Sequence, residues 1–320
     1  MTERIYRTAL ETQNRALRYV DESRERKERG LGFGLDLQRL IPAFSNFPIT
    51  PVTNGLVTIL GYTGNGKTTL TKIIVSEFAK TLVEPNDIIV YINYEESLEE
   101  LALKDITRLA NVKQSKVIRG EITDSEHTQL EAASEVESTK PIWAIADSIY
   151  DEGIPEQPNA SVITEQLIRI RDEDKKKIRL VVIDYFQLMP LLITNPSREG
   201  HRRNATYLQR LGNMLGCPIL IASQTNRNPQ DRALRVPKLS DAAESSAIEK
   251  SSRAVYSVYI PWKDNEELNG KLKINGTEYD ITPDMIVIRL IKQKHNPDPL
   301  TIVGYIDYDS MRLSLMSSKF

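Results

Sequence analysis

The residues with the clearest chemical meaning form a glycine-rich turn after an apolar stretch at positions 56–60. Gly61, Gly66, Lys67 and Thr68 fill the pattern G-x-x-x-x-G-K-[ST]. In such a loop the backbone N–H groups point inward around phosphates, and the following helix directs its positive end to the same place. The lysine can reach the β- and γ-phosphates, and the hydroxyl can bind Mg²⁺. The pattern predicts a site for a nucleoside triphosphate and its Mg²⁺ ion.

The whole loop is expected to take part in binding, because its backbone surrounds the phosphates. An ordinary glycine-rich turn before a helix is the alternative. Here the complete motif, the apolar strand before it and an amphipathic helix at 67–80 all agree. The residues assigned to the nucleotide are Gly61, Thr63, Gly64, Asn65, Gly66, Lys67, Thr68 and Thr69.

Two further apolar strands are predicted to end in carboxylates. Residues 179–183 run into Asp184, which is expected to hold Mg²⁺ together with Thr68. Residues 90–94 run into Glu95 and Glu96, and hydrolysis of a phosphate needs a group that activates water. Glu95 is preferred for this role, on a strand that we place beside the phosphate-loop strand.

Other features of these strand ends have two interpretations. Ser97 and Glu100 have the spacing of a capping box, so the carboxylates before them could mark only the start of a helix. Gln224 follows the apolar residues 218–223. An amide at this position can sense the γ-phosphate. The alternative is that Gln224 only begins a solvated loop.

Composition limits the other possibilities. The chain has 320 residues, 40% of them hydrophobic and 27% charged, which is typical of a soluble globular protein. No stretch approaches the roughly 18 apolar residues of a membrane span, and no secretory signal is recognisable, so no membrane association is expected. The one cysteine, Cys217, fits a reducing cytoplasm. The net charge of −2 means that nucleic-acid binding would need a local concentration of basic residues.

Strands and helices alternate through most of the chain, which predicts one doubly wound α/β domain. The early strands are continuously apolar, as in a parallel sheet, and the later ones resemble an antiparallel extension. Two Asn-Gly pairs predict a β-hairpin within 264–284. The expected strands are 56–60, 87–93, 142–146, 179–184, 218–223, 254–260, 285–292 and 302–307, and the expected helices are 67–80, 97–110, 124–138, 160–175 and 203–215.

The first 33 residues are predicted to be a helical arm and linker, followed by a domain at 34–320. Tyr6, Leu10, Leu17 and Val20 have roughly helical spacing. Residues 21–29 contain no apolar side chain and are expected to be a solvated end, before a glycine-rich linker. The apolar stripe could pack on its own domain or on a neighbouring subunit, and the sequence leaves both open.

Four segments resemble motifs of one family, and they occur along the chain in the same order as in that family. Residues 183–189 (I-D-Y-F-Q-L-M) resemble I-D-Y-L-Q-L-M, and residues 223–227 (S-Q-T-N-R) resemble S-Q-L-N-R. Residues 241–249 resemble D-L-R-E-S-G-A-I-E, and residues 292–296 resemble K-Q-R-N-G. Across about 34–316, the chain resembles the C-terminal RecA-like ATPase domain of DnaB-type replicative helicases.

The resemblance implies a RecA-like P-loop NTPase that uses ATP and Mg²⁺, forms a hexameric ring and moves 5′→3′ on single-stranded DNA. It assigns water activation to Glu95 and γ-phosphate sensing to Gln224. In the family the site lies between subunits, and a neighbour's basic residues complete it. Lys292 and Lys294 hold those positions here, and Lys294 replaces an arginine. Lysine keeps the charge but loses the two-pronged geometry.

The family's DNA-gripping loop also differs, because Ala243 and Ser246 replace its arginine and glycine. Two basic loops after strand ends are expected to compensate through salt-sensitive phosphate contacts, although a basic loop can also be merely solvated. The residues assigned to DNA are Arg198, Arg202, Arg203, Arg232, Arg235 and Glu244.

Two functions remain in view. The first is a ring-forming, ATP-driven helicase or translocase on single-stranded DNA, with a loader or another replication partner. The second is an ATP-dependent oligomeric switch or adaptor that recruits a partner without processive unwinding. Small-molecule phosphoryl transfer would leave the later motifs unexplained. The family's N-terminal collar domain has no counterpart here, so primase recruitment in the usual way is not expected.

Overall fold

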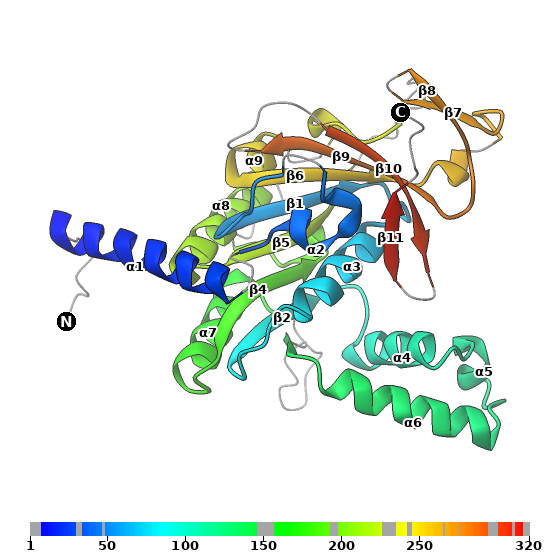
Figure 1. Cartoon of the computed structure of the whole chain (residues 1–320), viewed down its shortest axis with the longest axis horizontal. Coiled ribbons are helices and arrows are strands. Elements are labelled where there is room, and N and C mark those ends of the chain that lie inside the picture. The colour runs from blue at the N-terminus through cyan, green and yellow to red at the C-terminus, as the bar shows by residue number, and fades with distance from the viewer. Residues whose placement is uncertain are drawn as a thin grey trace.

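A nine-stranded sheet forms the centre of the described part of the molecule, in the order β11-β10-β9-β6-β1-β5-β4-β2-β3 (Figure 1). The computed structural model describes residues 8–29, 34–46, 49–145, 157–192, 198–225, 235–241, 245–264, 266–274, 276–293, 300–308 and 311–315. The strands of this sheet are β1 (Gly55–Gly61), β2 (Asp87–Asn93), β3 (Ile142–Ile145), β4 (Lys177–Asp184), β5 (Pro218–Gln224), β6 (Ser252–Tyr259), β9 (Met285–Gln293), β10 (Leu300–Asp307) and β11 (Arg312–Leu315).

The strand directions confirm the predicted sheet. From β3 to β6 every pair of neighbours is parallel, whereas β9, β10 and β11 add on as antiparallel strands. One detail of the prediction is wrong: β2 is not beside the phosphate-loop strand β1, because β5 and β4 lie between them. The first strand in sequence therefore sits near the middle of the sheet, with Gln224 on its direct neighbour β5.

Helices cover both faces of the parallel part of the sheet. In β4, Leu180 and Val182 are buried in the core that includes α3, and Val181 and Ile183 in the core that includes α7 and α8. Both faces are therefore dry, which explains why the strand sequence is continuously apolar. The α-helices are α1 (Ala9–Glu28), α2 (Leu37–Leu40), α3 (Lys67–Ala79), α4 (Leu98–Leu109), α5 (Gln114–Ile118), α6 (Asp124–Ser138), α7 (Ala160–Asp172), α8 (Arg198–Leu215) and α9 (Ser245–Ser251). None of the helices in these described ranges has the length and apolar character needed to cross a bilayer.

The predicted hairpin is present as β7 (Lys271–Ile274) and β8 (Thr277–Asp280). Leu272 and Ile274 are buried in a small core with Met285 and Val287 of β9. The hairpin therefore closes one end of the antiparallel extension with its own apolar residues. Between β2 and β3, α4, α5 and α6 extend away from the sheet (Figure 1).

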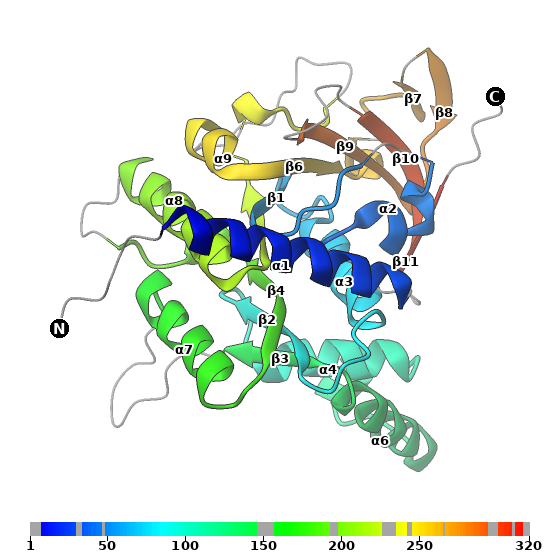
Figure 2. The ribbon, with the colours of Figure 1, turned by 60° about the vertical axis from the view of Figure 1, so that its left-hand side comes forward.

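Helix α1 is confirmed from Ala9 onward, and it lies along the outside of the domain (Figure 2). Its apolar residues Leu10, Leu17 and Val20 are 70%, 60% and 49% exposed. The prediction of a solvated end at 21–29 holds for most of these residues but is wrong for Arg26, which is only 8% exposed. The end of the helix packs on its own domain, and the beginning does not.

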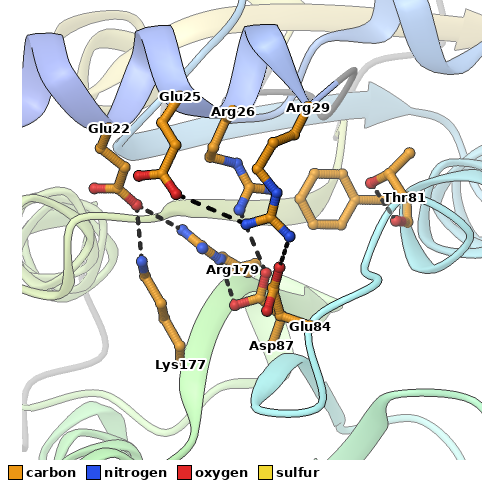
Figure 3. A network of polar contacts seen from close by, with 10 residues as sticks. Glu22, Glu25, Arg26, Arg29, Thr81, Glu84, Asp87, Lys177 and Arg179 are labelled. Atoms are coloured by element: carbon orange, nitrogen blue, oxygen red, sulfur yellow. Dashed lines mark hydrogen bonds and ion pairs between the residues drawn. The ribbon is translucent and has the colours of Figure 1, made fainter.

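An ion-pair network makes this contact (Figure 3). Arg26 and Arg179 both reach the buried carboxylate of Asp87, at 3.5 and 2.8 Å. Glu22 pairs with Lys177 at 2.8 Å and with Arg179 at 3.2 Å. Asp87 begins β2 and Lys177 begins β4, so the charges lie at the amino-terminal edge of the sheet. Arg26, which has no apolar neighbours in sequence, is buried here because its carboxylate partner Asp87 comes from a distant strand.

Candidate nucleotide-binding site

The phosphate loop lies at the opposite, carboxyl-terminal edge of the sheet, between β1 and α3. Gly64 and Gly66 have φ values of +68° and +82°, in the left-handed region that residues with a Cβ rarely adopt. The N–H of Asn65 donates to the carbonyl of Tyr62 at 3.1 Å and closes the turn. Gly66 immediately precedes the first residue of α3, so the helix amino terminus faces the loop. This is the geometry that binds phosphate.

Lys67 is buried in this loop and is 8% exposed. Its ammonium donates a 3.0 Å hydrogen bond to the carbonyl of Tyr62. Burial lowers the Lys67 pKa, and the nearby charges of Asp184 and Glu95 partly offset that effect. A bound phosphate would supply more of the negative charge that stabilises the ammonium.

Asp184 ends β4 and is 2% exposed. Burial raises the pKa of its carboxyl, and the charge of Glu95 adds to this, while hydrogen bonds from Thr68 and Tyr91 oppose it. Its Oδ1 atom is buried without a hydrogen-bond partner in the described residues.

These features fit a hard cation. Mg²⁺ is commonly held by one or two carboxylates together with phosphate oxygens and water. Thr68 and Asp184 would hold it here, and this assignment stays a prediction. No cluster of three or more histidine, cysteine, aspartate or glutamate side chains suited to a metal occurs within the described ranges.

Glu95 lies just beyond β2, next to the end of β4, because Asn93 and Asp184 are partners in the strand register. The side chain of Asn93 accepts a hydrogen bond from the Glu95 N–H at 3.4 Å and donates one to the Glu96 carbonyl at 2.6 Å. Glu95 is exposed, and its charge acts on both Asp184 and Lys67. The bend after β2 therefore brings Glu95 to the phosphate loop although β2 is not adjacent to β1.

Helix capping was the alternative role for Glu95 and Glu96, but other residues form the cap. Ser97 and Glu100 form the capping box of α4, with hydrogen bonds of 3.1 Å in both directions. Glu96 pairs with Lys104 on the same helix. The capping box does not use Glu95, whose charge acts on Lys67 and Asp184. The prediction that Glu95 activates water stays a prediction.

Gln224 is joined to the phosphate loop, since its Nε2 donates to the Thr63 hydroxyl at 2.6 Å. A residue that the sequence reasoning passed over, Gln187, holds this strand end. Its Nε2 donates to the Ser223 hydroxyl at 2.8 Å and to the Gln224 carbonyl at 3.0 Å, and its Oε1 accepts from the Gln224 N–H at 3.0 Å. Gln187 was visible as part of the segment 183–189, but its contact with β5 was not.

A second group was missed entirely. The short helix η4 (Pro261–Asp264) follows β6 and borders the phosphate loop. The N–H of Ile260 donates to the Asn65 side chain at 3.0 Å. A cavity of about 490 Å³ lies between these segments; its lining is Tyr62, Thr63, Asn65, Gln224, Thr225, Tyr259, Lys263 and Asp264. No local pattern in the sequence marks residues 261–264.

The basic residues assigned to a neighbouring site are only partly described. Lys292 lies on β9, and its ammonium donates to the carbonyls of Ser252, at 2.7 Å, and Glu249. These carbonyls are at the end of α9, where a positive charge is favourable. Lys292 is thus engaged within its own domain, and Lys294 lies outside the described residues.

The residues assigned to DNA do not form two loops. Residues 198–203 are the start of α8, so the prediction of a basic loop there is wrong. Glu199 pairs with Arg202 at 2.6 Å and with Arg203 at 3.4 Å, contacts that stabilise a helix start. The side chain of Arg198 lies outside the described part of the chain, as do residues 232 and 244 in full.

Arg235 also departs from the prediction. It is 6% exposed and pairs with Asp264 at 3.0 Å and with Glu267. A buried guanidinium with two carboxylate partners is not a solvent-facing phosphate contact. The prediction that Arg235 belongs to an exposed basic loop is therefore wrong.

The phosphate loop on a central strand, the buried aspartate two strands away and the amide on the strand between them define a RecA-like P-loop NTPase. The fold agrees: a solved ATPase domain matches 95% of this chain and 98% of its own, with a TM-score of 0.73 at 16% identity. A DnaB-like replicative helicase, solved in a study of its interactions with primase, matches with a TM-score of 0.65, covering 83% of this chain and 59% of its own at 16% identity.

Residues 52–297 match the model of the DnaB-like helicase C terminal domain. The chain belongs to this family. A probable replicative DNA helicase of Trieres chinensis is 26% identical over 84% of this chain and 53% of its own length. The replicative DNA helicase DnaB of Mycobacterium leprae is 27% identical over 54% of this chain and 27% of its own, and a probable plasmid replicative DNA helicase of Chlamydia trachomatis is 28% identical over 52% and 34%. The chain thus spans only part of the length of these relatives.

Proposed function

We propose that this chain is an ATP-hydrolysing motor that assembles into a hexameric ring and acts on single-stranded DNA. The observation that carries the proposal is the convergence of Lys67, Asp184 and Glu95 at one edge of the sheet, where Lys67 and Asp184 act on each other and the charge of Glu95 acts on both. The names of the relatives, which are replicative helicases, support the choice of DNA as the partner.

In this proposal the loop N–H groups and Lys67 bind the phosphates, and Thr68 and Asp184 hold Mg²⁺, which would neutralise charge that develops on the phosphates. Glu95 accepts a proton from the attacking water. Gln224 couples the γ-phosphate to β5, because its amide already contacts Thr63 in the loop. Lys294 of a neighbouring subunit completes the site, since the Lys292 ammonium is engaged within its own domain.

The domain organisation supports assembly. We assign residues 1–33 to an arm and linker and residues 34–320 to the ATPase domain. The arm is held to its own domain at Arg26, whereas Leu10 and Leu17 remain exposed. Packing that stripe on a second copy of the chain would remove apolar surface from water. The proposed ring would thus use the start of α1, and its anchored end would set the direction of the arm.

The test is steady-state ATP hydrolysis with and without a long single-stranded oligonucleotide, at low and at physiological salt. A motor should be stimulated by DNA, and the stimulation should weaken as salt rises. Lys67→Ala should abolish hydrolysis, and Lys294→Ala should stop hydrolysis but leave ATP binding intact. Binding of ATP with no response to DNA at either salt concentration would contradict the motor and favour an oligomeric switch.

A further inference from the structure

The ammonium of Lys263 lies directly against the phosphate loop. Lys263 belongs to η4, and a Cβ atom built on Gly64 would collide with its Nζ atom. The Lys263 ammonium therefore occupies the space that a side chain at Gly64 would fill. The Lys263 side chain also lines the cavity of about 490 Å³ beside Thr63 and Gln224. A second lysine thus borders the loop that Lys67 enters from inside.

Three contacts hold η4 in this place. The Asn65 side chain of the loop accepts from the Ile260 N–H at 3.0 Å. The Tyr259 hydroxyl donates to Asp264 at 2.6 Å, and Arg235 pairs with Asp264 at 3.0 Å. The position of Lys263 is therefore set by side chains from three segments, one of which is the loop itself.

The charges at this position are unbalanced. Asp264, the acidic neighbour of Lys263 in sequence, is engaged by Arg235 and Tyr259. The Lys263 ammonium makes no hydrogen bond or ion pair with any other residue that the structure describes. Its charge also contributes to the lowered pKa of Lys67, so the two ammonium groups are close enough to repel each other. A polyphosphate chain between them would remove this repulsion.

We propose that Lys263 is a second phosphate-binding lysine of the nucleotide site and that Arg235 positions it through Asp264. This inference rests on the proposed nucleotide-binding function. It assigns to the chain a positive charge of its own beside the phosphates, supplied by the same subunit as Lys67. The ligand class is a nucleoside di- or triphosphate, with recognition through the phosphate chain.

Affinity for ATP and for tripolyphosphate, measured on the full chain by calorimetry, tests the role of Lys263. Lys263→Ala should weaken both ligands about tenfold, which corresponds to about 1.4 kcal/mol. Tripolyphosphate has no base or ribose, so equal losses locate the contact on phosphate. Lys271→Ala is the matched control, because Lys271 is exposed on the hairpin and pairs with Asp280.

Three outcomes separate the claims. Failure of the unchanged chain to bind ATP would overturn the proposed function itself. Normal ATP affinity in Lys263→Ala would overturn only the role of Lys263. A loss for ATP without a loss for tripolyphosphate would place the lysine on the base or ribose, and would also overturn the inference.

The positioning role of Arg235 is tested by asking whether its loss and the loss of Lys263 have additive effects on ATP affinity. Arg235→Ala should weaken ATP binding as Lys263→Ala does, and the double variant should be no weaker than Lys263→Ala alone. Arg235→Lys should recover part of the affinity. A purely structural role would lower the melting temperature without changing the affinity, and independent roles would multiply the losses. If Arg235→Ala does not fold, Asp264→Asn breaks the same ion pair and takes the place of Arg235→Ala in the comparison of single and double variants.

Discussion

Tyr91 of β2 donates a 3.1 Å hydrogen bond to Asp184 at the end of the neighbouring strand β4. Both residues are buried, and the phenol occupies one carboxylate oxygen while Oδ1 has no hydrogen-bond partner in the described residues. The contact therefore orients a buried aspartate with one oxygen available for a ligand.

Asp184→Asn is expected to stabilise the nucleotide-free protein at neutral pH. Burial raises the pKa of Asp184 above its ordinary value, so the folded state holds a proton more tightly than the unfolded chain does. The contribution of Asp184 to stability is therefore greatest in acid and declines as the pH rises through the folded pKa. Melting temperatures of the unchanged protein and of Asp184→Asn, measured from acid to neutral pH, check the prediction. The difference between the two melting temperatures should shrink in acid. Mg²⁺-dependent hydrolysis should be lost; a lower melting temperature for the variant at neutral pH would contradict the argument.

Asp87→Asn should destabilise the protein by about 3 kcal/mol, because it removes a buried carboxylate that faces two guanidinium groups. Arg26 and Arg179 would keep their positive charges at the sheet edge with less compensation. Urea unfolding gives the free energy. Arg29→Ala is the control, since the pair of Arg29 with Glu84 is exposed and is expected to contribute about 0–1 kcal/mol. Equal effects of the two variants would show that the network does not anchor α1.

Gly64→Ala should reduce the affinity for ATP, since it forces a Cβ atom into the space of Lys263. Gly120 is a matched control with nearly the same backbone angle, φ +67°, and open space around it. Both alanine variants should lose about 1–2 kcal/mol of stability from the left-handed conformation. Only Gly64→Ala should also change nucleotide binding, as titration with ATP would show. The same affinity in both variants would speak against a close approach of Lys263.

Gln187→Ala should lower the rate of ATP hydrolysis more than the affinity for ATP. Its amide makes three hydrogen bonds with Ser223 and Gln224, so its loss leaves the strand end that carries Gln224 less well positioned. Misplacement of a group near the reacting atoms is expected to cost about 10- to 100-fold in rate. Steady-state kinetics separate kcat from KM. Gln38→Ala serves as the control, because the Gln38 amide donates to the Ser45 carbonyl, away from the site.

Much of the parallel sheet was predictable because its signals are local. Continuous apolar runs such as 180–183 mark strands covered on both faces, and the structure confirms them. The phosphate loop was predictable for the same reason, since its conformation depends on glycines and a helix start within a few residues. The capping box at Ser97 and Glu100 was also recognisable from its spacing.

Predictions failed where a charged residue needed a distant partner. Residues 21–29 lack apolar side chains and were expected to be solvated, but Arg26 is paired with Asp87, which lies 61 residues later in the sequence. Arg235 was assigned to DNA from its position in a basic stretch, but it is buried against Asp264. Residues 198–203 were expected to form a loop, but Glu199 stabilises them as the first part of α8. In each case the carboxylate that neutralises the arginine determines its environment.

Local sequence thus specified the residues of the proposed site at the strand ends: the glycine-rich loop, the aspartate and the glutamate. Backbone conformation and strand burial follow from residues within a few positions of each other, so pattern and spacing suffice for them. The sheet order was not accessible in this way, nor was the place of Lys263 beside Gly64 or the anchoring of α1. These arrangements depend on contacts between segments far apart in the chain. For α1 in particular, the free energy of the buried charge of Arg26 depends on which opposite charge the fold brings to it.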